Sequence, residues 1–367
     1  MQQAEKLKNI VAQFVESPDS TDIKPLGKGH INDSFKVVAN GKEYVMQRVN
    51  HDIFKNVEEL QNNIQRVTSH IRKKLTEAQV EDVDRKVLTL TPTLDGKLYY
   101  KDEDGNYWRM MDFIKDSMSY EEINPELAYR AGKAFGDFQK MLADLPNGPL
   151  FETIPNFHNI ESRLETFRES VHLNKVGRLF EVNELVKEIE SRADEMCKAE
   201  RMHREGKLVK RTNHCDTKVN NILFDKEGNV LCVVDLDTVM PGFVLSDFGD
   251  FIRTGANKGA EDDKNLDNVE VDLDIFEGYT KGYLENAASF LTDVEIENLA
   301  FGAKLLTYMQ TVRFLTDYID GDTYYKIEYG NHNLVRSLAQ FKLLQSLEEN
   351  FDKMQEIVLA NAEKYKS

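Results

Sequence analysis

The sequence contains no long apolar run. The longest uninterrupted one spans the five residues from Val230 to Val234, whereas about 20 are needed to cross a bilayer. We therefore expect no transmembrane helix. The N-terminal segment lacks the apolar block and the cleavage site of a secretory signal. Its apolar residues recur instead at the spacing of an amphipathic helix: Leu7, Ile10, Val11, Phe14 and Val15.

Cysteine is scarce. The three cysteines, Cys197, Cys215 and Cys232, have no CxxC spacing and cannot all pair with one another. This pattern favours neither a disulfide framework nor a zinc site. We expect Cys215 and Cys232 to be small core residues, and we expect a cytoplasmic protein, since a reducing compartment fits this cysteine content.

Positive charge is in deficit. The chain has 47 basic and 64 acidic residues, which gives a net charge of -17. Such a surface repels nucleic acid backbones and anionic lipid headgroups, so we expect neither as a partner. A nucleotide substrate stays possible, because a few local cations and Mg2+ can reverse the field within one cleft. The sequence does not indicate an oligomeric state.

The first part of the chain is rich in β-strand signals. Asn40-Gly41 separates two β-prone runs, which strongly predicts a hairpin because both turn positions need positive φ. Apolar residues at helical spacing predict one helix over 56–75, and shorter β-prone runs follow up to Ile114. Residues 1–115 are therefore predicted to form a sheet with one helix packed on it.

The pattern changes beyond Lys115. Helical periodicity covers 125–145, 160–169 and 176–198, and it resumes after a β-prone stretch at 208–234. A chain of 367 residues with 41% hydrophobic content is long enough for two lobes. We predict an α+β protein with a small β-rich N-lobe, residues 1–115, and a larger, mostly helical C-lobe, residues 116–367.

One segment has the spacing of a phosphoryl-transfer site. His214-Cys215-Asp216 is followed by Asn221 in the pattern H-x-D-x-x-x-x-N, and an apolar strand then ends at Asp235. Phosphoryl transfer needs a carboxylate to orient the attacking hydroxyl and oxygen ligands to hold Mg2+ against the phosphates. The first pattern alone is only suggestive, but the hairpin between it and Asp235 strengthens it. The alternative, purely structural role for Asp216 is that of an exposed acid in a loop or of a helix cap.

These motifs resemble the aminoglycoside phosphotransferase and choline kinase superfamily of small-molecule kinases. Two further runs are similar to the N-acetylhexosamine 1-kinase subgroup. The first extends from Gly27 to Phe35. The second extends from Asp235 to Arg253 and begins with Asp-Leu-Asp-Thr-Val-Met-Pro-Gly. The resemblance covers nearly the whole chain. It implies a protein-kinase-like two-lobe fold, with ATP as co-substrate. It also implies that Asp216 is the catalytic base and that Asn221 and Asp235 are Mg2+ ligands.

The resemblance also suggests a nucleotide site. Gly27 and Gly29 lie in the expected phosphate-covering loop, although Asn32 stands where a third glycine would be. Arg48 is the expected phosphate-binding cation, with a register uncertain by one residue, and Glu58 or Glu59 is its expected partner. Asp112 and Ile114 occupy the expected hinge, where backbone groups would meet adenine.

Other residues have a functional and a structural reading. Lys218 could meet the γ-phosphate or lie in solvent. His30, Arg313 and Tyr324 are suggested by the resemblance as sugar-binding residues beside Asp216; a surface ion pair and a packed ring are the alternatives. We expect His214 to brace the loop rather than react. Asp237 and Asp247 could support Mg2+ or stabilise local turns.

The sequence thus predicts a Mg-ATP-dependent kinase that phosphorylates the anomeric hydroxyl of N-acetylglucosamine or N-acetylgalactosamine. The alternatives are a kinase for another small alcohol, such as an aminoalcohol or a different sugar, and a pseudokinase that only binds. A protein substrate is disfavoured, because His214-Cys215-Asp216 lacks the arginine of regulated protein kinases and no Ala-Pro-Glu follows Asp235. The preferred sugar epimer depends on hydrogen bonds that the sequence does not define.

Overall fold

The computed structural model describes residues 2–18, 21–27 and 31–366. The chain divides into two compact units. The first, here called the sheet unit, contains Met1–Met118, Asp144–Pro155 and Leu223–Met240. The second, the helical unit, contains Ser119–Ala143, Asn156–Ile222 and Pro241–Ser367. Each unit is therefore assembled from separate stretches of the chain.

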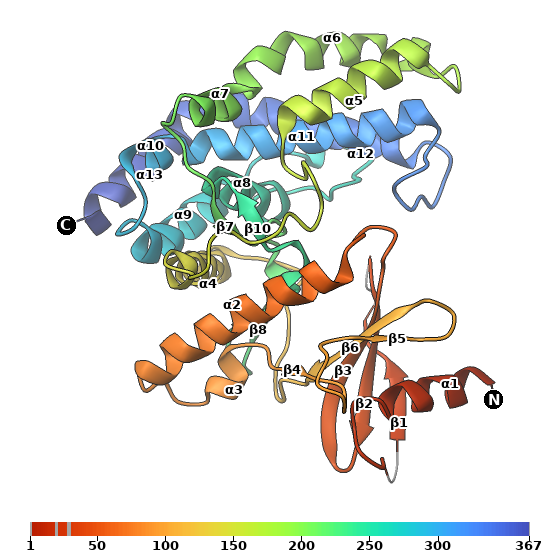
Figure 1. Ribbon diagram of the computed structural model, residues 1–367. Helices are drawn as coiled ribbons and strands as arrows, with labels where there is room; N and C mark the ends of the chain where they lie inside the picture. The colour runs from red at the N-terminus through yellow and green to blue at the C-terminus, as the bar shows by residue number, and fades with distance from the viewer. Residues whose placement is uncertain (1, 19–20, 28–30, 367) are drawn as a thin grey trace. The chain divides into compact units, whose positions relative to one another are not determined.

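An antiparallel sheet forms the centre of the sheet unit (Figure 1). Its strand order is β1-β2-β3-β6-β4, and β5 pairs with β6. Both turn residues of the predicted β2–β3 hairpin have positive φ, 51° at Asn40 and 72° at Gly41, which confirms the hairpin. The strands are β1 (Thr21–Pro25), β2 (Asp33–Ala39), β3 (Lys42–Val49), β4 (Leu90–Thr91), β5 (Tyr100–Lys101) and β6 (Tyr107–Asp112).

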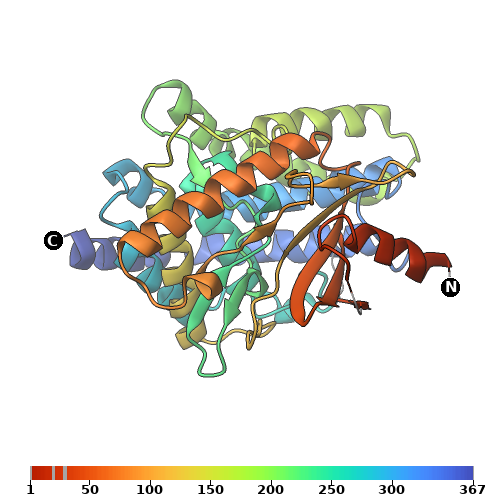
Figure 2. The same cartoon turned by 60° about the horizontal axis from the view of Figure 1, so that its bottom comes forward.

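Among the described residues of the sheet unit, three α-helices occur: α1 (Gln2–Val11), α2 (Val57–Glu77) and α3 (Val83–Lys86). The apolar residues of α1 and of the turn after it share one buried cluster with β2, β3 and β6, in which Val11, Met46 and Met110 are fully buried. This is the amphipathic packing predicted for the N-terminal segment, and Figure 2 shows α1 beside the sheet. The predicted helix over 56–75 is α2, which begins after the N-cap Asn56.

A late segment of the chain completes the sheet unit. It contains the hairpin formed by β8 (Ile222–Phe224) and β9 (Val230–Val233), followed by a short 3-10 helix, η2 (Leu236–Thr238). The Asn63 side chain of α2 donates to the carbonyl oxygens of Phe151 and Val239, at 2.8 and 3.2 Å. The Thr153 hydroxyl donates to the Asp237 carbonyl at 2.9 Å. The Asn63–Val239 bond attaches the segment after β9 to a helix 176 positions earlier in the chain.

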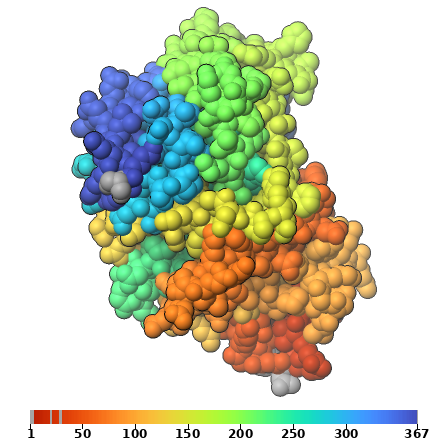
Figure 3. Space-filling model, turned by 60° about the vertical axis from the view of Figure 1, so that its left-hand side comes forward, coloured from red at the N-terminus to blue at the C-terminus, as the bar shows by residue number. Residues whose placement is uncertain are grey.

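The helical unit contains most of the long helices. The three predicted periodic segments appear as α4, α5 and α6. Figure 3 shows side chains around residues 180–205, in green, beside those of the C-terminal helices, in blue. The helices are α4 (Pro125–Leu142), α5 (Ile160–Leu173), α6 (Leu179–Met196), α7 (Lys198–Arg204), α8 (Val244–Gly255), α9 (Leu273–Ala287), α10 (Asp293–Glu297), α11 (Leu299–Asp320), α12 (His332–Glu349) and α13 (Phe351–Lys366).

Helices α4 and α9 cross at very short range. A Cβ placed on Gly282 would lie 1.9 Å from the Tyr129 carbonyl oxygen, and one on Gly132 would lie 2.3 Å from the Tyr279 carbonyl oxygen. Only a residue without a side chain allows the two backbones to approach this closely. The crossing fixes the position of Gln139 and Tyr283, both buried and both near the candidate site described below.

Two short elements carry the chain into the candidate site. β7 (Arg211–Asn213) pairs with β10 (Met240–Gly242), and the 3-10 helix η1 (Val219–Asn221) precedes β8. The part of the chain that the structure describes contains no helix long and apolar enough to span a membrane. The sheet unit with its antiparallel strands and the larger helical unit together match the predicted α+β, protein-kinase-like fold.

Candidate active site

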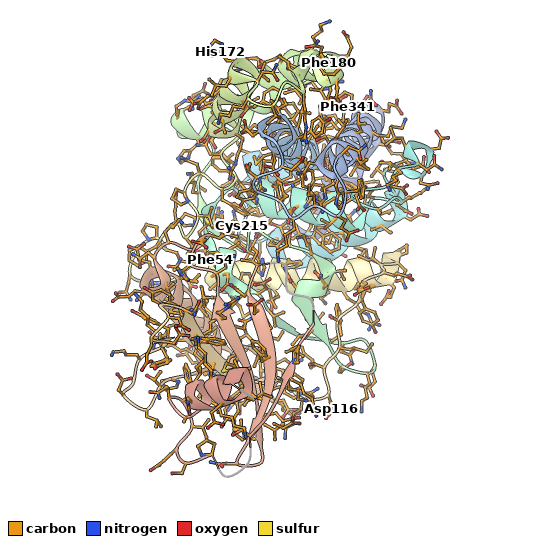
Figure 4. All side chains as sticks on the ribbon, turned by 90° about the vertical axis from the view of Figure 1, so that its right-hand side faces the viewer. Phe54, Asp116, His172, Phe180, Cys215 and Phe341 are labelled. Atoms are coloured by element: carbon orange, nitrogen blue, oxygen red, sulfur yellow. The ribbon has the colours of Figure 1, made fainter. Side chains whose placement is uncertain are left out.

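The loop from His214 to Lys218 connects β7 to η1 and is held by a buried carboxylate. Asp247, in the first turn of α8, is fully buried. Its oxygens accept hydrogen bonds from the backbone N–H groups of His214 and Cys215, at 2.8 and 2.7 Å. The Thr217 hydroxyl donates to the Asp247 carbonyl at 2.5 Å. Cys215, labelled in Figure 4, has a positive φ of 62°, so these bonds hold a conformation that the loop would not adopt cheaply alone.

A second layer of polar side chains supports Asp247. The Gln139 amide of α4 donates to Asp247 at 2.7 Å and to the Asn213 side chain at 3.0 Å. The Tyr283 hydroxyl of α9 donates in turn to the Gln139 oxygen at 2.5 Å. The crossing of α4 and α9 is thus connected to the loop through a continuous chain of buried hydrogen bonds. Such a network fixes a single geometry because every broken link would leave a buried polar group unsatisfied.

Asp216 lies in this loop within a set of polar contacts. The Asn221 amide nitrogen donates to the Asp216 carboxylate at 3.0 Å and to its carbonyl at 2.8 Å. The Asp216 N–H donates to Nδ1 of His214 at 3.3 Å, which agrees with the predicted bracing role of that histidine. Burial favours a raised pKa for Asp216, but the Lys218 ammonium and the Asn221 amide outweigh it and the pKa is lowered. The carboxylate is therefore ionised near neutral pH, as a base that accepts a proton must be.

Lys218 contacts Asp216 directly. Its Nζ lies 2.9 Å from the Asp216 carboxylate. The Asp216 charge raises the pKa of Lys218 against the opposite effect of burial, and Asp250 and Glu261 raise it further. Lys218 is therefore a fixed cation beside the carboxylate, and its ammonium does not point freely into solvent. The sequence left open whether it lies in solvent; the structure gives it an ion pair.

We expect the Asp247→Asn variant to lose activity while the reacting groups stay unchanged. The new amide would turn one N–H2 group toward the backbone N–H donors of His214 or Cys215, and the loop would lose one acceptor. Loss of a buried hydrogen bond costs about 1–3 kcal/mol, and misplacement of a catalytic group by about 1 Å costs about a hundredfold in rate. We therefore expect kcat to fall by about tenfold to a hundredfold, measured in a coupled ADP-release assay.

The matched control for this prediction is Asp274→Asn. Asp274 also lies in the first turn of a helix, α9, but is not buried among the loop groups. This variant should keep wild-type turnover. Full activity of Asp247→Asn would show that the loop does not depend on the buried carboxylate.

The sheet unit presents Asp235 at the end of β9. Asp235 is exposed and has a positive φ of 58°, at the N-cap of η2. The next acid, Asp237, is only 3% exposed and pairs with Arg109 through two hydrogen bonds, one of 2.9 Å and one shorter. Asn32 also donates to Asp237, at 2.5 Å. Asp237 is therefore a structural anchor that attaches η2 to β6, and its oxygens are committed to Arg109 and Asn32.

The residues predicted to bind the nucleotide phosphates lie in the β1–β3 region of the sheet unit. Arg48 pairs with Asp33 and not with Glu58 or Glu59, because Asp33 stands directly opposite Arg48 in the β2–β3 ladder. That part of the prediction was wrong. Gly27 has a φ of 66°, which favours glycine at the end of β1. Gly29 and His30 lie outside the described residues.

The predicted hinge residues are engaged within the sheet unit. The Asp112 N–H donates to the Thr89 carbonyl at 2.9 Å, and the Asp112 carboxylate pairs with Lys42 at 2.8 Å. The Ile114 carbonyl accepts from the Ser117 hydroxyl at 2.6 Å. Contact of Asp112 and Ile114 with adenine stays a prediction.

The predicted sugar-binding residues lie in the helical unit. Arg313 of α11 donates to the Gln310 side chain at 3.0 Å and stacks over the rings of Phe157 and Tyr325. Tyr324 is 59% exposed, and its ring lies 4.8 Å from that of Tyr325. The turn that carries both tyrosines is held by Asp317, which accepts from their N–H groups.

Sequence analysis missed two residues near Arg313. His158 stacks on Phe157 with 4.5 Å between ring centroids, and the Arg163 guanidinium donates to the Phe157 carbonyl at 2.9 Å. Burial, together with the charges of Arg313 and Arg163, lowers the pKa of His158 to about 3. No motif marks these positions, because they come together only after α5 and α11 pack. A local signal was present in the adjacent aromatic pair Phe157-His158, which directly precedes the N-cap Asn159 of α5.

The two units and the loop around Asp216 define a phosphotransferase of the protein-kinase-like fold, and comparisons with known proteins agree. A model of the phosphotransferase enzyme family matches residues 22–281. The chain belongs to this family.

Solved structures show the same fold. A microcompartment-associated aminopropanol kinase matches with a TM-score of 0.56 and 13% identity, over 96% of this chain and 98% of that one. A choline kinase from Cryptosporidium parvum matches with a TM-score of 0.58 and 11% identity, over 98% and 99%. A spectinomycin phosphotransferase in complex with ADP and spectinomycin matches with a TM-score of 0.53 and 14% identity, over 98% of both chains. At these identities the likeness establishes the fold and leaves the acceptor open.

Proposed function

We propose that this protein transfers the γ-phosphoryl group of ATP to the anomeric hydroxyl of an N-acetylhexosamine. The observation that supports the transfer most directly is the ionised Asp216 carboxylate, held by Asn221 and Lys218 in a loop with a buried support. The products would be ADP and a sugar 1-phosphate. The sequence resemblance to N-acetylhexosamine 1-kinases supports the choice of sugar.

The proposed step uses Asp216 as the base. The anomeric oxygen attacks the γ-phosphorus, the bond from that phosphorus to the β,γ-bridging oxygen breaks, and the hydroxyl proton passes to the Asp216 carboxylate. The anomeric hydroxyl is more acidic than other sugar hydroxyls, so a single carboxylate suffices. Lys218 would lie beside the transferred group and offset its negative charge. Most of the acceleration would come from positioning and from charge neutralisation.

Mg2+ is the metal that this chemistry requires, and Asn221 and Asp235 are its proposed ligands. Among the described residues, no group of three or more His, Cys, Asp and Glu side chains is arranged to hold a metal ion. Proteins commonly bind Mg2+ through one or two side-chain oxygens completed by substrate phosphates and water. The hydrogen bonds of the Asn221 amide to Asp216 use its nitrogen, so its oxygen would be the atom that binds the metal. The bound metal would neutralise charge on the phosphates.

Charges of both signs surround the loop that carries Asp216. Arg163 and Arg313 have no carboxylate partner among the residues that the structure describes. The acids Asp216, Asp250 and Glu261 all raise the pKa of Lys218. The choice of an uncharged sugar therefore rests on the sequence resemblance, and a kinase for another small alcohol, an aminoalcohol or a different sugar, stays the main alternative.

Blocking the anomeric oxygen tests the proposed position of transfer. We expect N-acetylglucosamine to be phosphorylated with ATP and Mg2+, and we expect its methyl glycoside to show no turnover above background. The glycoside keeps every other hydroxyl, so only the proposed nucleophile is removed. The measurement is ADP release with product analysis by 31P NMR.

Three other outcomes have distinct meanings. Comparable rates with both compounds would contradict transfer to carbon 1 and leave the kinase assignment standing. Turnover with choline or an aminoalcohol alone would replace the sugar by a cationic acceptor. Absence of acceptor-dependent turnover across sugars and alcohols would favour the binding-only alternative.

A further inference from the structure

Helix α8 presents a second acid to the loop that carries Asp216. Asp250 lies one turn after Asp247 and is only 5% exposed. Its Oδ2 accepts a hydrogen bond from the Thr217 N–H at 3.1 Å. That N–H belongs to the peptide group that joins Asp216 to Thr217. Asp250 therefore holds the backbone directly beside the proposed base.

Arg253, also on α8, orients the Asp250 carboxylate. Its Nε and Nη2 both donate to Oδ1 of Asp250, at 3.2 and 2.9 Å. The other carboxylate oxygen, Oδ2, is the one that accepts from Thr217. Because the guanidinium is a rigid, planar fork, these bonds restrict the rotation of the carboxylate. Arg253 thus acts on the loop through Asp250, without touching the loop in any of these bonds.

The other side of Arg253 is bound by the segment between α8 and α9. We call residues 256–272, which include the 3-10 helix η3 (Leu266–Asn268), the α8–α9 connection. Nη1 of Arg253 donates to Glu261 of this connection at 2.5 Å and to Gln340 of α12 at 3.4 Å. The Glu261 side chain is 45% exposed. A continuous series of contacts therefore extends from a carboxylate at the surface to the loop of the proposed base.

The α8–α9 connection is held by contacts of its own. At its base, the Lys258 N–H donates to the Glu270 carbonyl at 3.0 Å, and the Lys258 ammonium pairs with the Glu270 carboxylate at 2.6 Å. Asp262, next to Glu261, contacts Nε2 of the buried His332 at 2.8 Å. Because these contacts restrict the connection, less conformational entropy is lost when Glu261 pairs with Arg253.

We propose that Glu261 and Arg253 are positioning residues for phosphoryl transfer, which act through Asp250 to hold the Asp216–Thr217 peptide in the geometry that the base requires. This inference rests on the proposed role of Asp216 and is independent of the identity of the acceptor. Misplacement of a catalytic group by about 1 Å costs about a hundredfold in rate. A contact that never touches the substrate can therefore control kcat.

The exposed end of this series provides a variant that keeps the fold. Glu261→Ala removes the carboxylate that accepts from Arg253. Its control is Glu270→Ala, which truncates an exposed glutamate of the same connection that pairs with Lys258 instead. We expect Glu261→Ala to lower kcat by about threefold to tenfold and to leave the KM for ATP unchanged. Glu270→Ala should keep both constants within about twofold of wild type.

A substitution at Arg253 tests the buried part of the series. Arg253→Lys keeps a positive charge beside Asp250, but an ammonium cannot reproduce the planar fork that joins Asp250 to Glu261. We expect kcat to fall by about tenfold to a hundredfold. Adding Glu261→Ala to this variant should lower kcat by no more than about a further twofold, because the series is already broken. Fully additive losses would show that Glu261 acts by another route and would overturn the inference.

The outcomes distinguish this inference from the proposed function. Unchanged kcat in Glu261→Ala, or an equal loss in Glu270→Ala, would overturn the inference while leaving Asp216 as the base. If no acceptor is phosphorylated, or if Asp216→Asn keeps wild-type turnover, the proposed function fails, and deuterium exchange of the backbone amides of 214–218 then decides the inference. Faster exchange in Glu261→Ala than in Glu270→Ala would support it, and equal exchange would overturn it. Urea unfolding of each variant checks that the fold is intact.

Discussion

The Asp216→Asn variant should lose at least about a hundredfold in kcat while binding nucleotide nearly as well as the wild type. The asparagine keeps the size of the side chain, and its amide oxygen can still accept from Asn221. It cannot accept the proton of the attacking hydroxyl, and a positioned base typically contributes 10^2 to 10^4 in rate. Steady-state kinetics gives kcat, and titration with Mg-ADP measures nucleotide affinity separately.

The control for this variant is Asp267→Asn, which makes the same chemical change at an exposed position of the helical unit. It should behave as the wild type. Turnover of Asp216→Asn within about twofold of wild type would remove Asp216 from the chemical step. A large loss of Mg-ADP affinity instead would indicate that the carboxylate acts mainly in nucleotide binding, with Lys218 as its partner.

Adding one methyl group at Gly282 should strongly destabilise the helical unit. In Gly282→Ala the new Cβ would lie 1.9 Å from the Tyr129 carbonyl oxygen and 2.8 Å from its carbon. These are backbone atoms of α4, so no side chain can rotate away and the two helices must separate. Overpacking of a core costs about 1–3 kcal/mol and occasionally more. We expect a loss at or above the upper end of that range, measured as the free energy of unfolding in urea.

Gly330→Ala provides a matched control. It is the same substitution at a glycine without a positive φ, where an added Cβ meets no heavy atom within 4 Å. Alanine there should be neutral or slightly stabilising, because it restricts the unfolded chain. If Gly282→Ala unfolded at the same urea concentration as Gly330→Ala, the close crossing of α4 and α9 would be refuted.

Local patterns predicted the secondary structure well. The Asn40-Gly41 hairpin depends only on the backbone freedom of two adjacent residues, and it forms at the predicted place. The helix after Asn56 follows from its apolar spacing and from a side chain that accepts from the Glu59 N–H. The β-prone runs after Val87 form very short strands, because β4 and β5 each pair with part of β6 over two residues. Pairing partners, and not local propensity, set those lengths.

The sequence was less informative about the support of the candidate site. Asp216 and Asn221 lie five residues apart, and the structure brings their side chains into contact as the motif predicted. From the sequence, Asp247 and Asp237 were equally plausible as metal-site residues or as turn caps. In the structure both carboxylates are buried: Asp247 accepts from the N–H groups of His214 and Cys215, and Asp237 accepts from Arg109. Those partners, 33 and 128 positions away, are defined only by tertiary packing. For the same reason His158 could not be identified before α5 and α11 were placed.

The composition of the sheet unit has a consequence for any attempt to isolate or exchange it. The sheet unit is compact in space but is assembled from three separate stretches of the chain, because 144–155 and 223–240 belong to it while the residues between them belong to the helical unit. A fragment that stops at Met118 would bury Arg109 without the carboxylate of Asp237, and an unpaired buried charge costs several kcal/mol. A single cut in the chain, at whatever position, therefore cannot separate the sheet unit from the helical unit.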